Sequence, residues 1–322
     1  MKDLFMSGFV RALFQPRLDL TLSTGKHFET RIVERPGLWM SQEELASLSA
    51  DLVTVASKTL ARGSLTYGVF SGDPERLKST IVTIVRRKDT RQPVAFNALA
   101  LMDITTMTEP MEVLHLGLVM VDPDQQSQGL SWVLYGLTCI LLLFRNQMRP
   151  LWVSNVTQVP AIVGMVAETF DDVFPTPRRS KERSLQHLLL ARTIMAEHRY
   201  VFGVGADAGF DEDRFVITNA YTGGSDDLKK TFEEAPHHRN AIYNEFCQNL
   251  LDYDRGDDVL QLGQIDLATA SGYLKNSVPR ASLASVGVTL VALMLQRVIL
   301  PALHWFDSNR HFGTLRPRKD PI

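Results

Sequence analysis

The segment from residue 112 to residue 145 constrains the fold of this chain more than any other part of its sequence. Residues 112–121 (EVLHLGLVMV) predict a strand, and Pro123 ends it because proline cannot donate a hydrogen bond to a sheet ladder. Residues 128–145 are mainly apolar over a length that predicts a helix. The chain is therefore expected to contain a strand that passes through a short turn into a long apolar helix.

The neighbouring residues extend this pair of elements to the order strand, strand, strand, helix, strand, helix. Residues 79–85 and 93–102 flank a polar connection and predict a hairpin. Residues 151–155 predict a further strand, and Pro160 opens a helix that extends to about Phe170. Because a helix crosses between the last two strands, these strands are expected to be parallel neighbours in a mixed sheet.

Two helices are predicted before the hairpin. Residues 1–18 carry apolar side chains near helical spacing, which predicts a short amphipathic helix that Pro16 ends. Ser41 and Glu44 stand at the capping-box positions of a second helix, where each side chain can bond the backbone N–H of the other. The apolar face of this second helix consists of Leu45, Leu48, Leu52 and Val55.

Charge and metal-ligand spacing exclude several classes of function. The 322 residues carry a formal net charge of -2, which gives no basic footprint for nucleic acid. One basic cluster, residues 178–183, is short and follows two prolines, so we interpret it as a solvated linker. His237, His238 and Cys247 do not have the spacing of a zinc site, and no metal is expected.

The cysteines and the start of the chain indicate the compartment. Only two cysteines occur, Cys139 and Cys247, which excludes a disulfide framework and fits a reducing environment. Residues 1–7 lack the charged start and long apolar core of a cleaved signal peptide. We therefore expect a cytoplasmic protein, either free or peripheral to a membrane through an apolar segment near the C-terminus.

The turn between the third strand and the long helix is the candidate ligand site. The first N–H groups of a helix have no partner inside it, and the helix dipole makes that end partly positive. Small or polar residues from Gln126 to Leu130 lie at this point, and Gly129 lets a phosphate approach without an intervening Cβ. An ordinary tight turn explains the same spacing, so the residues alone leave both interpretations open.

This turn resembles the acetyl-CoA-binding signature of the GNAT superfamily of N-acetyltransferases, Val-x-Pro-x-x-Gln/Arg-x-x-Gly-x-Gly/Ala. The fixed positions of the signature are occupied by Val121, Pro123, Gln126 and Gly129. Ser131 replaces the last Gly or Ala, which is a mild departure. The resemblance covers residues 26–175, about half of the chain, and includes the order of strands and helices around the turn.

The resemblance implies a co-substrate, an acceptor and the residues that bind them. The co-substrate would be acetyl-CoA or another acyl-CoA, and the acceptor an unidentified amine that attacks it directly in a ternary complex. The backbone of Val119, Met120 and Val121 would pair with the pantetheine arm of CoA. The pyrophosphate would be held by Gln126, Ser127, Gln128, Gly129, Leu130 and Ser131.

The sequence departs from the family after the fourth strand. The family often has Asn-x-x-Ala, then a Tyr that protonates the departing thiolate, then Gly-Phe. Alignment on Ala161 and Phe170 places three other residues at the Asn, Tyr and Gly positions, namely Gln158, Met165 and Thr169. Asn155 lies a few residues before the Asn position. Three alternatives follow: another group protonates the thiolate, the thiolate leaves unprotonated, or the domain has lost catalysis.

The candidate catalytic residues are Glu112, His115 and Asn155. Glu112 lies near the start of the third strand, close to where several family members keep a catalytic Glu, and His115 has a near-neutral reference pKa. Strand alternation places Glu112 and His115 on opposite faces unless a bulge intervenes. A solvated carboxylate at Glu112 and a hydrogen-bonded core histidine at His115 are the structural alternatives to a catalytic base.

The rest of the chain predicts a mainly helical extension. Residues 184–197 and 226–252 have helical patterns, and residues 214–221 predict a strand between them. We therefore divide the chain into an N-terminal amphipathic segment at 1–25, a GNAT-like acyl-CoA-binding domain at 26–175 and a C-terminal extension at 176–322.

An apolar tail at residues 284–306 ends this extension. Arg297 and Pro301 argue against a simple membrane span, because a charge and a helix breaker fall inside it. Three interpretations remain: a buried helix that covers the core, a homo-oligomer interface, or a helix lying at a membrane surface.

The sequence as a whole predicts an α+β fold, with a GNAT-like mixed sheet flanked by helices and a helical C-terminal extension. The predicted function is transfer of an acyl group from CoA to an amine. The alternative is a non-catalytic binding or assembly protein that keeps the fold, either free or membrane-associated.

Overall fold

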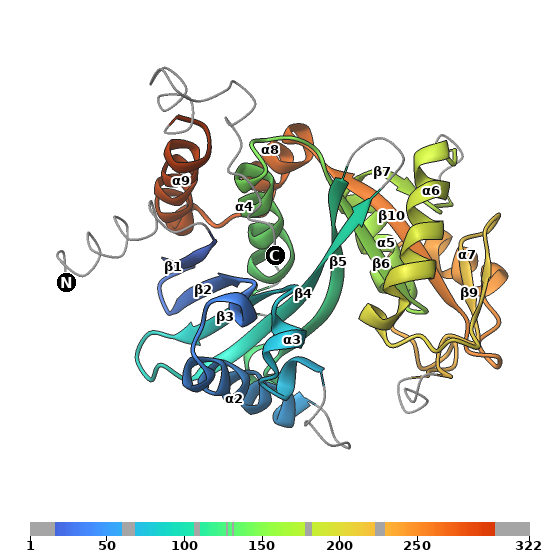
Figure 1. Ribbon diagram of the computed structural model, residues 1–322, viewed down its shortest axis with the longest axis horizontal. Helices are drawn as coiled ribbons and strands as arrows, with labels where there is room; N and C mark the ends of the chain where they lie inside the picture. The colour runs from blue at the N-terminus through green and yellow to red at the C-terminus, as the bar shows by residue number, and fades with distance from the viewer. Residues whose placement is uncertain are drawn as a thin grey trace. The chain divides into compact units, whose positions relative to one another are not determined.

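The computed structural model describes residues 17–59, 68–105, 110–126, 128–130, 132–177, 182–222 and 229–299. Their strands are β1 (Asp19–Ser23), β2 (Phe28–Glu34), β3 (Thr80–Arg87), β4 (Pro93–Thr105), β5 (Pro110–Val121), β6 (Leu151–Thr157), β7 (Asp171–Phe174), β8 (Gly209–Asp211), β9 (Val216–Thr218) and β10 (Asp258–Ile265). Hydrogen bonds join them in the order β1-β2-β3-β4-β5-β6-β10-β9-β8, and β7 pairs with β10 (Figure 1). The predicted α+β fold, a mixed sheet flanked by helices, is confirmed.

The chain divides into two compact units that are not continuous in sequence. The first unit comprises residues 1–99, 118–150 and 270–322, and the second comprises residues 100–117 and 151–269. Strands β4 and β5 contribute residues to both units, because the boundaries fall inside them.

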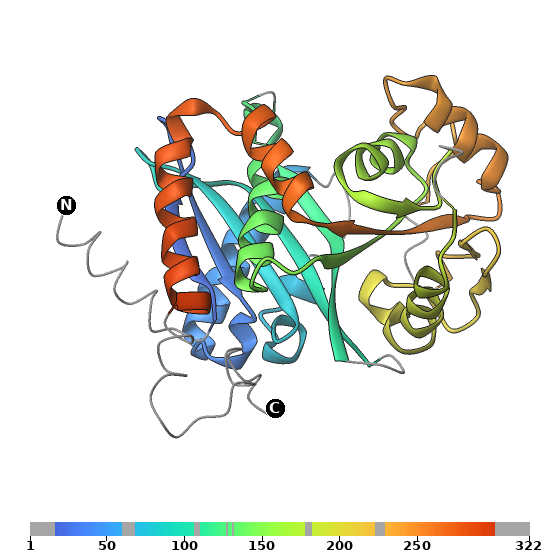
Figure 2. The same cartoon turned by 90° about the horizontal axis from the view of Figure 1, so that it is seen from above.

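In the first unit, α2 (Gln42–Thr59) covers one face of the strands. The expected capping box starts it: the Ser41 amide donates to Glu44 Oε2 at 2.8 Å, and the Glu44 amide donates to Ser41 Oγ at 3.3 Å. The predicted apolar face of α2 is buried against strand residues that include Val82 and Phe96. The helices α4 (Thr138–Arg145) and α9 (Arg280–Met294) lie side by side, and α9 also contacts β1 (Figure 2).

The expected helix at residues 128–145 begins later and differently from the prediction. Gly129 has a left-handed φ of 68°, and the helix starts at Trp132 with a π-turn, Trp132–Leu137, that continues into α4. Asn97 Nδ2 donates to the Leu134 carbonyl, and Tyr273 Oη donates to the Trp132 carbonyl at 3.0 Å. Two carbonyls of the π-turn therefore accept from side chains of distant elements.

Close packing at Gly136 accompanies this π-turn. A Cβ at Gly136 would lie 1.9 Å from Cε1 of Tyr273, whose ring comes from α8 (Leu267–Asn276). Only glycine leaves room for that ring. A third small polar contact, between Thr83 Oγ1 and Thr138 Oγ1 at 2.8 Å, ties β3 to the start of α4.

In the second unit, β5 and β6 run parallel, as predicted. Val113, Leu114 and His115 pair with residues 152–154 without a shift of register. The predicted helix that Pro160 opens is α5 (Pro160–Thr169), and Ser184 caps the predicted helix α6 (Leu185–Thr193). These elements enclose a core that includes Trp152, Leu190, Phe215, Leu260 and Leu262.

Strand β10 was not anticipated from the sequence. It comes from the segment 176–322 and forms a seven-residue antiparallel ladder with β6, from Val259–Thr157 to Ile265–Leu151. This segment, expected to be mainly helical, therefore supplies a fully integrated strand of the sheet. The division at 1–25, 26–175 and 176–322 stays a prediction about sequence segments.

Two predicted elements within that segment are shorter in the structure. The strand at 214–221 reduces to β9, because Phe215 and Asn219 on either side of it have positive φ. The helix at 226–252 reduces, within the described residues, to α7 (Ala241–Leu250). Pro236 interrupts any helix before that point, and Asn240 caps α7 by accepting from the Ile242 amide.

The described part of the apolar tail forms α9 and the π-turn Leu295–Ile299. Val286 and Leu293 are buried, whereas Val288 and Val291 are 50% and 58% exposed, so one side of α9 packs on the fold and the other does not. No helix among the described residues has the length and apolar content needed to cross a membrane. The oligomer and membrane-surface interpretations stay predictions. Residues 300–306 and the predicted helix up to residue 16 lie outside the described residues.

Candidate functional site

The turn after β5 is fixed by bonds from its first residue. The Asp122 amide donates to the Val94 carbonyl at 2.8 Å, and Asp122 Oδ1 accepts from the Asp124 amide at 3.1 Å. Lys58 Nζ lies 2.5 Å from Asp122 Oδ2. This hydrogen bond from Lys58 lowers the pKa of Asp122 below its usual range. The strand therefore ends in an ionised, paired carboxylate that caps a short 3₁₀ turn, Pro123–Gln125.

The second half of the turn presents backbone N–H groups. Within the described residues, no hydrogen bond leaves the amides of Gly129, Leu130 or Trp132, whereas the Leu130 carbonyl accepts from Val133 and Leu134. Apart from its chain neighbours, no described residue has a heavy atom within 4 Å of the place where a Cβ on Gly129 would stand. Among the described residues the turn thus combines amides that have no partner with an open glycine, which is the arrangement that an anion at a helix start needs.

The other predicted CoA residues surround these donors. Val119, Met120 and Val121 follow the segment of β5 that pairs with β6, and the Thr59 hydroxyl donates to the Val121 carbonyl at 3.4 Å. Gln126 and Gln128 are described and lie on the turn, and Gln128 is exposed. Ser127 and Ser131 lie outside the described residues.

The two base candidates lie three residues apart on β5, and strand alternation would place them on opposite faces of the sheet. The register of β5 with β6 is continuous through Val113, Leu114 and His115. Glu112 is half-buried near the start of the strand. His115 is 4% exposed, and its Nδ1 lies 3.0 Å from Ser154 Oγ.

The surroundings of His115 are those of a core histidine. Its ring lies 5.2 Å from the ring of Phe202, and burial lowers the pKa of His115 to about 4. The imidazole is therefore neutral near pH 7 and has little affinity for a proton taken from an ammonium group.

Asn155 contributes to an interior amide network. It is 3% exposed, and its Nδ2 donates to Gln261 Oε1 on β10 at 3.4 Å. Gln261 Nε2 in turn donates to the carbonyls of Pro175 at 3.1 Å and Val163 at 3.4 Å. Asn155 is thus brought next to β10, while Met165, at the family's Tyr position, is half-buried on α5.

A polar cluster that the sequence did not reveal lies at the end of β6. Gln158 Nε2 donates to Tyr221 Oη at 2.6 Å, and Tyr221 Oη donates to Asp258 Oδ1 at 3.1 Å. Tyr253 Oη donates to the backbone carbonyl of Gln158 at 2.7 Å. Burial, followed by repulsion from Asp257, raises the pKa of Asp258 to about 7 despite the bond from Tyr221. The detectable signal was an acidic pair directly before the strand-like residues VLQL.

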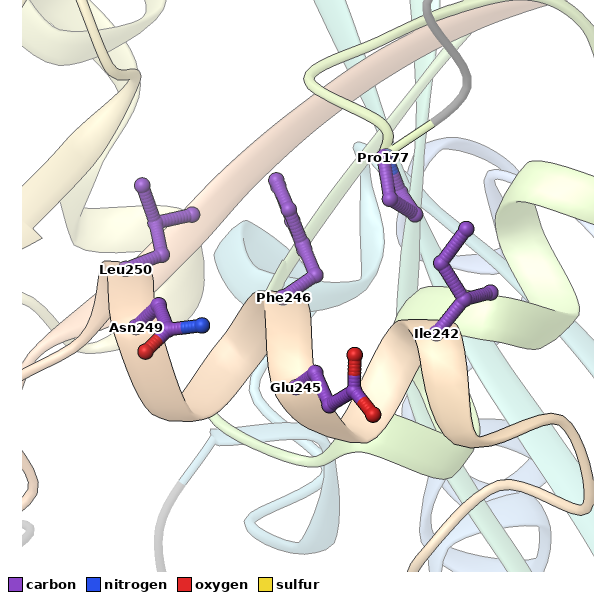
Figure 3. Close-up of a pocket in the computed structure, with 6 residues that line it drawn as sticks. All are labelled: Pro177, Ile242, Glu245, Phe246, Asn249 and Leu250. Carbon is purple, nitrogen blue, oxygen red and sulfur yellow. The ribbon is translucent and has the colours of Figure 1, made fainter.

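A surface hollow of about 370 Å³ lies beside α7. Three apolar side chains of α7, Ile242, Phe246 and Leu250, line it together with Pro177 (Figure 3). Glu245 and Asn249 provide its polar atoms. The predicted turn residues do not line this hollow. Within the described part of the chain, no group of three or more His, Cys, Asp or Glu side chains could hold a metal ion.

Comparison with known proteins gives little beyond this geometry. No family model matches the chain, and no curated protein matches its sequence. Among solved structures, it is similar to a ribosomal-protein-S5-alanine acetyltransferase from Vibrio fischeri, with 12% identity and a TM-score of 0.32. That match covers 76% of this chain and 96% of the other.

Proposed function

We propose that this protein is an acyl-CoA-dependent N-acyltransferase, which moves an acetyl or other acyl group to an amine. The observation that carries the proposal is the turn from Asp122 to Trp132. It combines four of the five specified residues of the acyl-CoA signature with backbone donors and an open glycine. An ordinary turn would need neither the signature nor the open space.

The turn fits a pyrophosphate through its backbone more than through charged side chains. The amides of Gly129, Leu130 and Trp132 would donate to phosphate oxygens, and the start of the helix adds a favourable partial charge. Lys58, the basic side chain bonded to this turn, is already paired with Asp122. CoA binding should therefore depend on the shape of the turn at Gly129 and only weakly on ionic strength.

The reaction needs proximity and removal of a proton. When bound, acyl-CoA supplies an activated thioester, and the enzyme would hold its pantetheine arm along the backbone of Val119–Val121. The acceptor arrives as an ammonium, so a group of the protein or water must take a proton before nitrogen attacks. Glu112 is the base that the family resemblance supplies, whereas the buried, neutral state of His115 supports a structural role.

Calorimetric titration of CoA into matched glycine variants tests the binding step. Gly129→Glu adds a bulky negative side chain to the proposed phosphate site, and we expect at least a tenfold loss of affinity. Gly203→Glu is the control, because Gly203 has a similar φ of 73° and likewise no heavy atom within 4 Å of its Cβ position. Equal affinities for CoA in the wild type and the Gly129 variant would refute the site.

Release of the CoA thiol from acetyl-CoA tests the transfer step. The acceptors should include a dipeptide with a free α-amine, a lysine derivative, an amino sugar and an alkylamine, and longer acyl-CoAs should be compared. Amine-dependent thiol release supports the proposal. Tight CoA binding at the turn without release by any acceptor would instead support the non-catalytic alternative, for which the absence of a Tyr at Met165 is the motivating observation.

A further inference from the structure

Exposed apolar side chains gather on the side of α9 that does not pack on the fold. Among the described residues, eight large hydrophobic side chains are exposed, and four of them belong to α9 and the π-turn after it. These four, which we call the outer face of α9, are Leu283, Val288, Val291 and Ile299. Single exposed apolar residues need no explanation, whereas a cluster of them on one element marks a surface for interaction.

The helical geometry places the outer face opposite the buried side of α9. At about 100° per residue, Leu283, Val288 and Val291 fall within a sector of roughly 140°. Val286 and Leu293, which are buried, lie within about 20° of each other on the other side. The contacts of α9 with α4 and β1 stay within the first unit (Figure 2). The outer face therefore belongs to one unit and is directed away from its core.

The polar residues of α9 do not interrupt the outer face. Ser282 is fully buried, and the Thr289 hydroxyl donates to the Ser285 carbonyl at 2.9 Å, so its own helix satisfies it. A helix that is apolar on all sides is normally buried on all sides. Within the described part of the chain, protein covers only one side of α9, so the other side requires a second apolar environment.

The outer face belongs to a basic segment of a chain that is slightly acidic overall. Residues 267–322 contain seven lysines and arginines and two aspartates, whereas the whole chain has 34 basic and 36 acidic residues. No Asp or Glu occurs in residues 267–306. Lys275 and Arg280, which precede the outer face, are exposed. A partner that covers this face should therefore be apolar and negatively charged.

An anionic lipid surface fits these two properties better than a second copy of the chain does. In a symmetric dimer the outer face would contact itself, so the basic residues around it would approach those of the other copy. Residues 267–306 contain no acidic side chain that could offset this repulsion. A membrane with anionic lipids offers an apolar interior beneath a negative surface, and each Lys or Arg near that surface strengthens binding.

We propose that the outer face of α9 docks on the surface of a membrane that contains anionic phospholipids. The helix would lie along the surface, with Val288 and Val291 entering the boundary between headgroups and acyl chains. Lys275 and Arg280 would remain at the level of the lipid phosphates. This surface contains none of the residues proposed to bind CoA, so the inference does not depend on the proposed acyl transfer.

Flotation of the full chain with lipid vesicles tests the proposal. The wild type should bind vesicles of equal parts phosphatidylcholine and phosphatidylglycerol about tenfold or more tightly than vesicles of phosphatidylcholine alone, and added salt should weaken this binding. The double variant Val288→Glu/Val291→Glu should lose about tenfold or more of the affinity, because it removes apolar surface and adds negative charge. Leu185→Glu/Tyr200→Glu is the matched control, since these side chains are 71% and 59% exposed and lie in the second unit.

Several results of this experiment would overturn the proposal. They are equal binding by the wild type and Val288→Glu/Val291→Glu, equal binding of the wild type to both kinds of vesicle, and no binding to either. Sedimentation velocity without lipid tests the competing partner. A wild-type dimer that Val288→Glu/Val291→Glu converts to a monomer, together with no vesicle binding, would assign the outer face to a second copy of the chain.

A fluorescent label on the outer face gives a measurement that does not rely on a loss of binding. Val291→Cys can be labelled with an environment-sensitive dye, because the two native cysteines, Cys139 and Cys247, are buried. Its emission should move to shorter wavelength when anionic vesicles are added, whereas the same label at Tyr200→Cys should not respond. An unchanged emission at residue 291 would contradict docking. An apolar emission before lipid is added to the monomer would show that the chain itself covers this face, and would also overturn the proposal.

Discussion

Replacing Asp258 by Asn should make the protein more stable above pH 7 and remove part of its pH dependence. Asn keeps the shape of the side chain and an oxygen that accepts from Tyr221, but it cannot ionise. Asp258 is 6% exposed and its pKa rises from 3.8 to about 7, so the folded state resists its ionisation. The quantity to be measured is the free energy that opposes the ionisation of Asp258 in the folded state.

The sign follows from proton binding by the folded and unfolded states. Below about pH 4 both states hold the proton of Asp258. Between about pH 4 and 7 the unfolded chain loses it while the folded chain keeps it, so the free energy of unfolding falls as pH rises. At 1.36 kcal/mol per pH unit, the total fall is roughly 4 kcal/mol, and it persists above pH 7, where both states are ionised.

Chemical denaturation of the full chain at a series of pH values between 4.5 and 8 measures this effect. The difference in unfolding free energy, variant minus wild type, should increase with pH by a few kcal/mol and level off above pH 7. The unpaired amide of the new Asn subtracts roughly 1–3 kcal/mol at every pH and leaves the slope unchanged. A difference that does not vary with pH would show that Asp258 titrates normally, and the electrostatic reasoning about the cluster would be wrong.

Three further predictions follow from other parts of the fold. Burial lowers the pKa of His115 to about 4, so the folded state binds fewer protons at this residue than the unfolded state does below pH 6.5. The unfolding free energy of the wild type minus that of His115→Gln should therefore fall by about 3 kcal/mol as the pH drops from 6.5 to 4, because the contribution of Asp258 is common to both proteins; a difference that does not vary with pH would contradict the prediction. Gly136→Ala should lower the free energy of unfolding by about 1–3 kcal/mol, because the new Cβ clashes with the Tyr273 ring. The same substitution should cost much less in a Tyr273→Ala background, and additive losses in the double mutant would contradict the contact. Deleting residues 280–322 removes buried side chains such as Val286, so the truncated protein should melt at a lower temperature; an unchanged melting temperature would show that α9 is not part of the fold.

Local chemistry determined much of the first half of the chain. The capping pair at Ser41 and Glu44, the apolar face of α2 and the stop at Pro123 each depend on residues a few positions apart. The parallel pairing of β5 and β6 also followed from the sequence, because two strands of one sheet that are joined by a crossing helix run parallel. The turn at Gly129 was likewise predicted as a candidate anion site, because a short motif at a helix start encodes it.

Long-range contacts decided what the sequence did not. Two carbonyls of the π-turn at the start of the helix, those of Leu134 and Trp132, accept from Asn97 and Tyr273, which lie far away in the chain. No pattern of neighbouring residues reports that two distant side chains will occupy helical carbonyls. The prediction therefore placed the helix start at about residue 128, four residues before its observed start at Trp132.

The residues of the candidate site also fall into those that the sequence predicted and those that only the tertiary structure brought together. The sequence supplied the phosphate turn, because a backbone site is encoded by a short motif, and it supplied Glu112 and His115 only as residue types on a strand. Whether a histidine is buried and neutral depends on what packs against it, here Ser154 and Phe202. The Gln158–Tyr221–Asp258 cluster joins three segments that only the pairing of β10 with β6 brings together, so tertiary structure alone sets the charge state of its carboxylate.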